Sequence, residues 1–405
     1  MNKSRKFVSI LLAVFFIVAA MPMITVRAQE FETTAKAYAL IEANTRQIIA
    51  SENGDEKFHA AGLTKLMSYL LFFEALADGK VRSEDSVRVS QEAAKKGGTS
   101  VFLDSGTSYS FETLLKPAIM CNANDAVTAL AEHVAGSEAA FVELMNARAK
   151  ELGLSCTFAD CTGISSESLV SANDLAVIAA ELSKYSGFFK YSAIWLDTFT
   201  HESGRETEMS NSNVLIKNDL YDGMSTGSTP SSGYSAAISA KSGGGRFIAI
   251  VIGDKDTGSR FKLAEELIGY AIATFGVKQI AQQGGKVKTL PVANGDVKEV
   301  GVYAKEDLSI LYKKGEEGSI STNIQVDDLA APLQKGQIVG KIVITAPEGE
   351  ISVALRTAAL RSLTAASAGP GFSRDAMTRP WRASKTAATA IFIRWRCFLN
   401  SNQCY

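Results

Sequence analysis

The most apolar stretch of the chain runs from Leu63 to Phe73, where the sequence LTKLMSYLLFF places apolar side chains at nearly every position. A helix that is hydrophobic on all sides is typical of the interior of a domain rather than of its surface. The pattern therefore predicts a central, buried helix. Lys65 lies in the first turn of this helix, and a charged amine that enters a core needs a partner or a chemical role.

Apolar and alternating segments predict strands near both ends of the first 280 residues and helices between them. Residues 37–42 and 47–50 flank Asn44 and Thr45 and predict a β-hairpin. Further strands are predicted over residues 100–103, 234–239 and 246–252, the last two adjacent and antiparallel. Helices are predicted over residues 111–115, 125–134, 138–152, 172–184 and 261–275. This order favours one α+β domain whose sheet joins both ends of the segment.

Polar residues and glycines indicate where several of these helices begin and end. Ser110 and Ser171 precede helical segments and are expected to be their N-caps. Asn122 or Asn124 is the expected N-cap of the helix over residues 125–134, and Gly136 is its expected C-terminal stop.

A second pattern follows the segment QQGG at residues 282–285, which is the predicted domain boundary. Beyond it, apolar residues alternate with polar ones over residues 297–303, 308–312, 320–326 and 342–345. A period of two with Gly, Asp and Pro between the segments is typical of strands. We therefore expect a first domain over residues 29–280 and a small all-β domain over residues 286–355.

Residues 1–28 have the three parts of a secretory signal peptide, namely a basic start, an apolar run over residues 7–20 and the small residue Ala28 at the end. Cleavage after Ala28 is expected, and an uncleaved anchor is the alternative. No later stretch reaches the ~18 uncharged apolar residues that a spanning helix needs, so no transmembrane helix is expected in the mature chain.

The net charge and the spacing of histidines and cysteines argue against nucleic-acid binding and against a metal site. The chain carries 42 Lys and Arg against 43 Asp and Glu, so no overall positive field favours nucleic acid. Its three histidines and five cysteines form no cluster at metal-ligand spacing, and we expect no metal and no cofactor. Cys156 and Cys161 are close enough in sequence for a small disulfide loop, and two buried free thiols are the equal alternative.

Three short segments contain polar residues that matter for a possible active site: AGLTKLM at residues 61–67, CNANDA at 121–126 and DGMSTGSTP at 222–230. Together they resemble the penicillin-binding D-alanyl-D-alanine carboxypeptidases, the low-molecular-weight serine peptidases of the cell wall. The motifs of that family are Ser-x-x-Lys at the start of a buried helix, Ser-x-Asn about sixty residues later, and Lys-Thr-Gly on a strand. The resemblance covers roughly residues 30–350. It implies an α+β, penicillin-binding and β-lactamase-like serine peptidase domain followed by a small all-β domain.

The resemblance also implies a site for the D-Ala-D-Ala end of a peptidoglycan stem peptide. In the family, the first serine attacks the carbonyl of the penultimate D-Ala, and the lysine, here Lys65, accepts its proton. The second serine relays a proton to the leaving amine, and the asparagine, here Asn124, holds the substrate amide. The third-motif lysine attracts the terminal carboxylate, while the neighbouring Thr226 and Gly227 positions align the peptide.

The chain departs from the family at three positions that take part in this chemistry. Gly62 replaces the nucleophile, Asn122 replaces the relay serine and Ser225 replaces the third-motif lysine. The nearest hydroxyls do not substitute, because Thr64 lies about 200° around the helix from position 62 and Ser68 nearly two turns further on. We therefore expect no catalysis through an acyl-enzyme.

Three functions remain open at this point. The chain is either an inactive relative that binds stem peptides or a cell-wall partner, a functional or weakly active serine-type carboxypeptidase, or a non-catalytic structural protein without a ligand. In each case export and the family resemblance imply a place in the cell wall or at the outer face of the plasma membrane.

The composition changes at residue 356, where the family resemblance stops. Residues 356–405 contain seven Arg and one Lys against one Asp. Ile391, Trp395 and Phe398 recur at helical spacing, so this tail has the features of a short basic helix on an anionic membrane surface. The abrupt change of composition also fits a translated frameshift, which would leave a basic, disordered end.

Cleavage of the signal peptide predicts that the secreted protein begins at Gln29, because small residues precede the cleavage site of such segments. Sequencing the N-terminus of the exported protein checks this expectation. An exported chain that still begins at Met1 would contradict it and favour the uncleaved anchor.

Overall fold

The computed structural model describes residues 31–294, 298–331, 333–346 and 349–357. The predicted signal peptide lies outside these residues, and so does the predicted basic tail over residues 356–405 except for Arg356 and Thr357, which are the last two residues of a strand (349–357). No helix of the described part is long and apolar enough to span a membrane.

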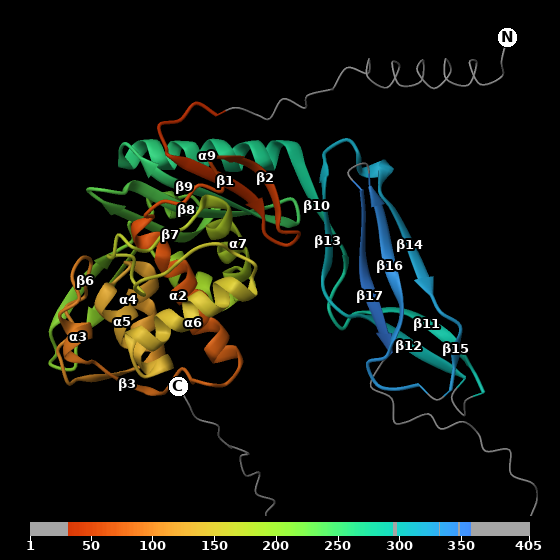
Figure 1. Ribbon diagram of the computed structural model, residues 1–405, viewed down its shortest axis with the longest axis horizontal. Coiled ribbons are helices and arrows are strands. Elements are labelled where there is room, and N and C mark those ends of the chain that lie inside the picture. Colours follow the sequence, from red (N-terminus) through yellow and green to blue (C-terminus); the bar gives the residue numbers. More distant parts are fainter. Residues whose placement is uncertain (1–30, 295–297, 332, 347–348, 358–405) are drawn as a thin grey trace, which may run out of the picture.

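A five-stranded antiparallel sheet forms the middle layer of the first domain (Figure 1). Its strand order is β2-β1-β9-β8-β7, so the hairpin of the two earliest strands joins the three later strands through the pairing of β1 with β9. The sequence therefore correctly predicted a sheet that joins both ends of the domain. The strands are β1 (Ala37–Glu42), β2 (Gln47–Glu52), β7 (Tyr221–Thr229), β8 (Gly233–Ser242) and β9 (Gly245–Asp254).

Helices cover both faces of this sheet (Figure 1). Helix α9 (Thr257–Thr274) packs on one face, and a helical body covers the other. Alternation along β1 explains the two layers, since Ala39 and Ile41 belong to the core of the helical body while Tyr38 and Leu40 belong to the core under α9. The helical body contains η1 (Ala61–Thr64), α2 (Lys65–Ala77), α3 (Gln91–Ala94), α4 (Phe111–Met120), α5 (Asn124–Ala135), α6 (Glu138–Glu151), α7 (Ala172–Leu182), η2 (Ser186–Phe188) and α8 (Phe189–Ser192).

Helix α2 is the buried helix that its apolar sequence predicts. Its residues Leu66, Met67, Tyr69, Leu70 and Phe72 are completely inaccessible to solvent. It contacts α5, α6 and α7, so helices surround it on several sides.

The remaining elements of the first domain are two short strand pairs and a turn. Strand β3 (Ser86–Arg88) pairs with β4 (Ser108–Ser110), and β5 (Leu196–Thr200) pairs with β6 (Glu206–Ser210). The turn is η3 (Val214–Lys217).

The expected asparagine cap of α5 is wrong. The N-cap is Ala123, which makes no side-chain capping bond, and Asn124 is already the first helical residue. Asn122 lies just before the helix in the left-handed region, at φ +58°. The amides of both asparagines are bonded to other segments, as described below, and so do not cap the helix. The expected caps Ser110 and Ser171 are confirmed, since each side chain accepts a bond from the third residue after it.

The strand predicted over residues 100–103 is also wrong. This segment is an irregular loop, because its backbone amides bond to a side chain instead of to a neighbouring strand. The buried carboxylate of Asp125 accepts bonds from the amides of Val101 and Leu103 and from the hydroxyl of Ser100. The loop is therefore fixed to the start of α5.

The structure decides between the two alternatives for the cysteines. Cys156 and Cys161 are both free thiols. Cys161 is completely buried, and its Sγ lies 3.3 Å from Oε1 of Glu138. Burial, together with the negative charge of Glu138, holds the pKa of Cys161 well above its usual value.

The second domain consists of strands with a core of its own, which includes Val302, Ile344 and Leu355. One sheet has the order β14-β16-β17-β12-β11-β15, and β10 pairs separately with β13. Strand β10 lies before the predicted boundary at residue 282, yet its partner belongs to the second domain. The elements are β10 (Phe275–Ala281), β11 (Lys286–Ala293), β12 (Glu299–Ala304), β13 (Leu308–Lys313), the turn η4 (Glu317–Ser319), β14 (Ser321–Val326), β15 (Leu329–Ala330), β16 (Ile338–Ala346) and β17 (Gly349–Thr357).

Candidate functional site

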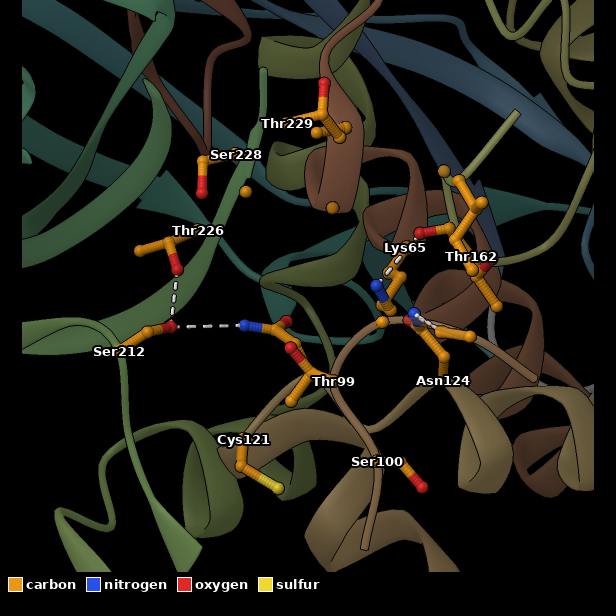
Figure 2. Close-up of a pocket in the computed structure, with 18 of the residues that line it drawn as sticks. Lys65, Thr99, Ser100, Cys121, Asn124, Thr162, Ser212, Thr226, Ser228 and Thr229 are labelled. Atoms are coloured by element: carbon orange, nitrogen blue, oxygen red, sulfur yellow. Dashed lines mark hydrogen bonds between the residues drawn. The ribbon is translucent and has the colours of Figure 1, made fainter. Parts of the chain in front are cut away.

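The three motif segments, which are far apart in sequence, meet around one cavity of about 530 Å³ (Figure 2). The turn η1 and the start of α2 form one wall, the residues before α5 another, and strand β7 a third. Six of the seven residues singled out from the sequence line the cavity: Gly62, Lys65, Asn122, Asn124, Thr226 and Gly227. The seventh, Ser225, is buried and touches Asn122.

Lys65 is a buried amine without a carboxylate partner among the described residues. Its Nζ donates a hydrogen bond to the carbonyl oxygen of Thr162 at 2.9 Å, as Figure 2 shows. The nearby Asp160 accepts bonds from Thr162, Ile164 and Ser168 instead. Burial lowers the pKa of Lys65 to about 8, although the charge of Asp160 acts in the opposite direction.

Asp160 is the anion that faces this amine at longer range. Burial acts to raise the pKa of its carboxyl, but hydrogen bonds from the Thr162 side chain, the Ile164 amide and the Ser168 side chain outweigh burial and hold the pKa below its usual value. Asp160 is therefore a stable negative charge, and it favours the protonated form of Lys65 without bonding to it.

Gly62 lies so close to β7 that the position has no room for a side chain. A Cβ placed on Gly62 would stand 2.7 Å from the carbonyl oxygen of Thr226 and 3.2 Å from Cα of Gly227. The approach is reciprocal, because a Cβ on Gly227 would collide with the backbone of Gly62. Ala61, just before, adopts φ +48°, which is uncommon for a residue with a side chain. Gly62 thus lies on a turn that packs directly against the strand.

Asn122 and Ser225, the second and third altered positions, are hydrogen-bonded to each other. The Ser225 hydroxyl donates to Oδ1 of Asn122 at 2.9 Å. The hydroxyl of Tyr69 lies 3.1 Å from the same oxygen, and Nδ2 of Asn122 lies 3.4 Å from the hydroxyl of Ser212. Two altered positions therefore complete each other with a neutral pair, which supplies no charge and no proton relay.

Asn124 and Thr226, which keep the family residue types, present polar atoms to the cavity. Nδ2 of Asn124 donates to the carbonyl oxygen of Gly97 at 2.7 Å, while its Oδ1 is buried and has no partner. The hydroxyl of Thr226 is bonded to that of Ser212 (Figure 2). Ser212 lies on the segment after β6 and connects Thr226 to Asn122. Asn124 thus lines the cavity with a buried Oδ1 that has no partner, and Thr226 and Ser212 line it with hydroxyls bonded to each other.

Sequence reasoning missed Arg260, a cation in the first turn of α9 that reaches the cavity between β7 and β8. Its Nη1 donates to the carbonyl oxygens of Ser235 at 2.9 Å and Gly227 at 3.2 Å, and its buried Nε has no partner. Burial lowers the pKa of Arg260 to about 10. The only signal in the sequence was an arginine immediately before the apolar run that starts at Phe261. Sequence reasoning also missed the loop over residues 97–101 and the β6 residues 208–210, which complete the wall.

Comparison with known proteins assigns the chain to a family. The family model for D-alanyl-D-alanine carboxypeptidases matches residues 24–256, and the model for the C-terminal domain of penicillin-binding protein 5 matches residues 275–362. The chain belongs to the D-alanyl-D-alanine carboxypeptidase family. The predicted family and the α+β fold with an all-β C-terminal domain are therefore confirmed.

Individual relatives are similar over most of their length. The D-alanyl-D-alanine carboxypeptidase DacF of Bacillus subtilis is 35% identical over 332 residues, which are 80% of this chain and 85% of DacF. DacC of Escherichia coli is 33% identical over 76% of this chain and 79% of its own. Among solved structures, penicillin-binding protein 5 from Haemophilus influenzae superposes with a TM-score of 0.69 at 28% identity, covering 83% of this chain and 99% of that one.

Replacing the buried amine is expected to stabilise the protein at neutral pH. Below about pH 8 the Lys65 amine is charged in both the folded and the unfolded chain, and folding carries the full desolvation penalty. Lowering the pKa from 10.5 to about 8 corresponds to about 3 kcal/mol. Because Lys65→Met also loses the bond to Thr162, we expect a gain in unfolding free energy of about 2 kcal/mol at pH 7.

This gain has a defined pH dependence. As the pH rises from 8 towards 10.5, the folded chain loses its proton first, and the penalty and the advantage of Lys65→Met both decrease. Denaturant unfolding between pH 6.5 and 9.5 measures this change, and Lys150→Met on the exposed face of α6 provides a control for the same substitution. A destabilised variant, or an advantage that grows with pH, would contradict this account of the amine.

Gly62→Ser is expected to destabilise the protein by about 1–3 kcal/mol, because its Cβ has to push the turn away from β7. It is also expected to react very little with penicillin, since Asn122 and Ser225 still lack the relay and the cation. The matched control is Gly97→Ser, which also lines the cavity but has no atom within 4 Å of the added Cβ. Thermal unfolding and intact-mass measurement give the two readouts.

The triple variant Gly62→Ser, Asn122→Ser and Ser225→Lys is expected to recover acylation, provided that the shifted turn opens the site. If Gly62→Ser alone reacts fully with penicillin, Asn122 and Ser225 do not limit acylation. If it also keeps the thermal midpoint of the wild type, the close contact with β7 does not limit the stability of this variant.

Proposed function

We propose that the mature chain is an exported, catalytically inactive member of its family that binds the D-Ala-D-Ala end of peptidoglycan stem peptides or a cell-wall partner. The observation that carries the proposal is Gly62, which has no nucleophile and lies against Thr226. Loss of the nucleophile in a serine hydrolase lowers turnover by a factor on the order of 10⁶. The neutral pair of Asn122 and Ser225 supports the same conclusion, because it offers neither a relay nor a cation.

The remaining polar groups support binding of a peptide with a free carboxylate. Lys65 and Arg260 are both cationic groups on the cavity wall, and the polar side chain of Asn124 lines the same cavity. Strand β7 is the edge strand of the sheet, so an extended peptide has a backbone edge to lie against. A cavity of about 530 Å³ is within the range of ligand sites.

The proposal also covers export, the domain bounds and the place of action. Residues 1–28 would direct export, residues 29–280 and 286–355 would form the two domains, and the mature protein would act in the cell wall or at the outer face of the plasma membrane. The basic tail over residues 356–405 is proposed to be without function, with binding to an anionic membrane as the alternative.

The first test is covalent labelling. We expect no mass increase after prolonged incubation with benzylpenicillin, because no hydroxyl stands at position 62, and a serine penicillin-binding enzyme treated in parallel shows that the reagent is active. A stoichiometric adduct, mapped to any residue of the cavity, would instead favour a working carboxypeptidase.

The companion measurement is calorimetric titration with a stem pentapeptide ending in D-Ala-D-Ala, against the same peptide ending in L-Ala-L-Ala. We expect binding of the first that is several-fold tighter, and a loss of this preference in Thr226→Val, which removes a hydroxyl from the cavity wall. Equal, negligible binding of both peptides would favour a structural protein without this ligand.

A further inference from the structure

Glu208 is a carboxylate at the candidate site that the proposed function leaves without a role. It belongs to β6 and lines the cavity, where it is the only acidic residue among the lining residues in the described part of the chain. The other charged lining residues, Lys65 and Arg260, are cations. Glu208 is exposed, and its carboxylate makes no hydrogen bond or ion pair with another described residue. It is therefore available to a ligand that enters the cavity.

The alternation of side chains along β6 indicates which face of the strand borders the cavity. Successive side chains of a strand point to opposite faces, so Glu208 and Ser210 share one face and Met209 lies on the other. All three residues line the cavity, but Glu208 and Ser210 are exposed whereas Met209 is buried in the core of the helical body. The exposed face of β6 therefore borders the cavity. Thr198 stands directly opposite Glu208 on β5, so no cation occupies the neighbouring cross-strand position.

The hydrogen bond between Ser212 and Thr226 limits how far Glu208 can lie from strand β7. The hydroxyl of Ser212 is bonded to that of Thr226, which belongs to β7. Glu208 is four residues earlier in the chain than Ser212, a separation of at most about 14 Å when fully extended. A peptide that ends at Thr226 has two alanines at its end, which span about 7 Å of extended chain. A long side chain on the residue before them can cover the remaining distance to Glu208.

We propose that Glu208 binds the side-chain ammonium group of the residue that precedes D-Ala-D-Ala in a stem peptide. This inference rests on the proposed function, since the peptide must occupy the cavity. The residue in question is commonly a diamino acid, such as lysine or diaminopimelic acid, and its second amine becomes acylated when two stems are cross-linked. Glu208 then determines specificity, because it favours stems with a free amine over stems whose amine has been acylated.

The charges of the cavity match those of such a ligand. The end of a stem that is not cross-linked carries a carboxylate and an ammonium group. The cavity wall supplies cations at Lys65 and Arg260 and one anion at Glu208. Charge complementarity of this kind contributes to specificity more than to affinity. An acylated amine is neutral and loses the attraction to Glu208. Because Glu208 is exposed, salt screens the attraction, and the preference for the free amine is modest.

The experiment is calorimetric titration at low ionic strength with two stem pentapeptides. Both are acetylated at the N-terminus and end in Lys-D-Ala-D-Ala, and in one of them the lysine side chain is acetylated as well. The side-chain amine is therefore the only cation that distinguishes them. We expect the wild type to bind the peptide with the free amine roughly threefold to fivefold more tightly. This preference should decrease as salt is added, because salt screens an exposed ion pair.

Three variants of β6 make the result specific. Glu208→Gln should bind both peptides with the affinity that the wild type has for the acetylated one, and Glu208→Lys should reverse the preference. Glu206→Gln is the matched control, because Glu206 is exposed on the same face of β6 but does not line the cavity. It should keep the preference of the wild type. All three variants should keep the thermal midpoint, since substitutions of exposed side chains without partners change stability little.

The outcomes separate the inference from the proposed function. Equal affinity of the wild type for both peptides, or a preference that persists in Glu208→Gln, would overturn the inference and leave the proposed function intact. Loss of the preference in Glu206→Gln would also overturn it, because the effect would then come from the charge of the strand as a whole. If neither peptide binds, the binding of stem peptides is refuted and the inference with it.

Discussion

The contact between the turn η1 and strand β7 is the constraint on which the site depends. It brings the backbone of Gly62 against Thr226 and Gly227, where a side chain on either glycine position would collide with the opposite backbone. This contact also fixes the start of the buried helix α2, and with it the amine of Lys65. Because the sheet is continuous from β2 to β7, the same contact connects the helical body to the whole sheet.

The altered positions of the site are consistent with one another. A buried polar side chain at position 122 would be left without a partner if position 225 carried no polar group, which is unfavourable. Here Ser225 donates to Asn122, and Asn122 is connected through Ser212 to Thr226. The result is a neutral network in which most groups are satisfied.

Lys65 is a buried amine with no hydroxyl side chain at position 62 beside it. The amine keeps its buried position but bonds only to the carbonyl oxygen of Thr162. Burial disfavours its charged form, which is why the pKa of Lys65 is low, at about 8. In an active serine enzyme such an amine is useful because it accepts a proton from a neighbouring hydroxyl. Without a hydroxyl at position 62 the same property is a cost to stability.

The sequence alone determined the family, the α+β class, the buried helix and six of the residues that line the cavity, because periodicity indicates which side of an element is buried and the order of motifs indicates ancestry. Tertiary structure decided what depends on distances between separate segments of the chain. The expected asparagine cap and the strand over residues 100–103 failed because Asn122, Asn124 and Asp125 bond to partners on other segments. The close approach of Gly62 to β7 and the pairing of Asn122 with Ser225 both result from how separately predictable elements dock, which no local pattern in the chain records.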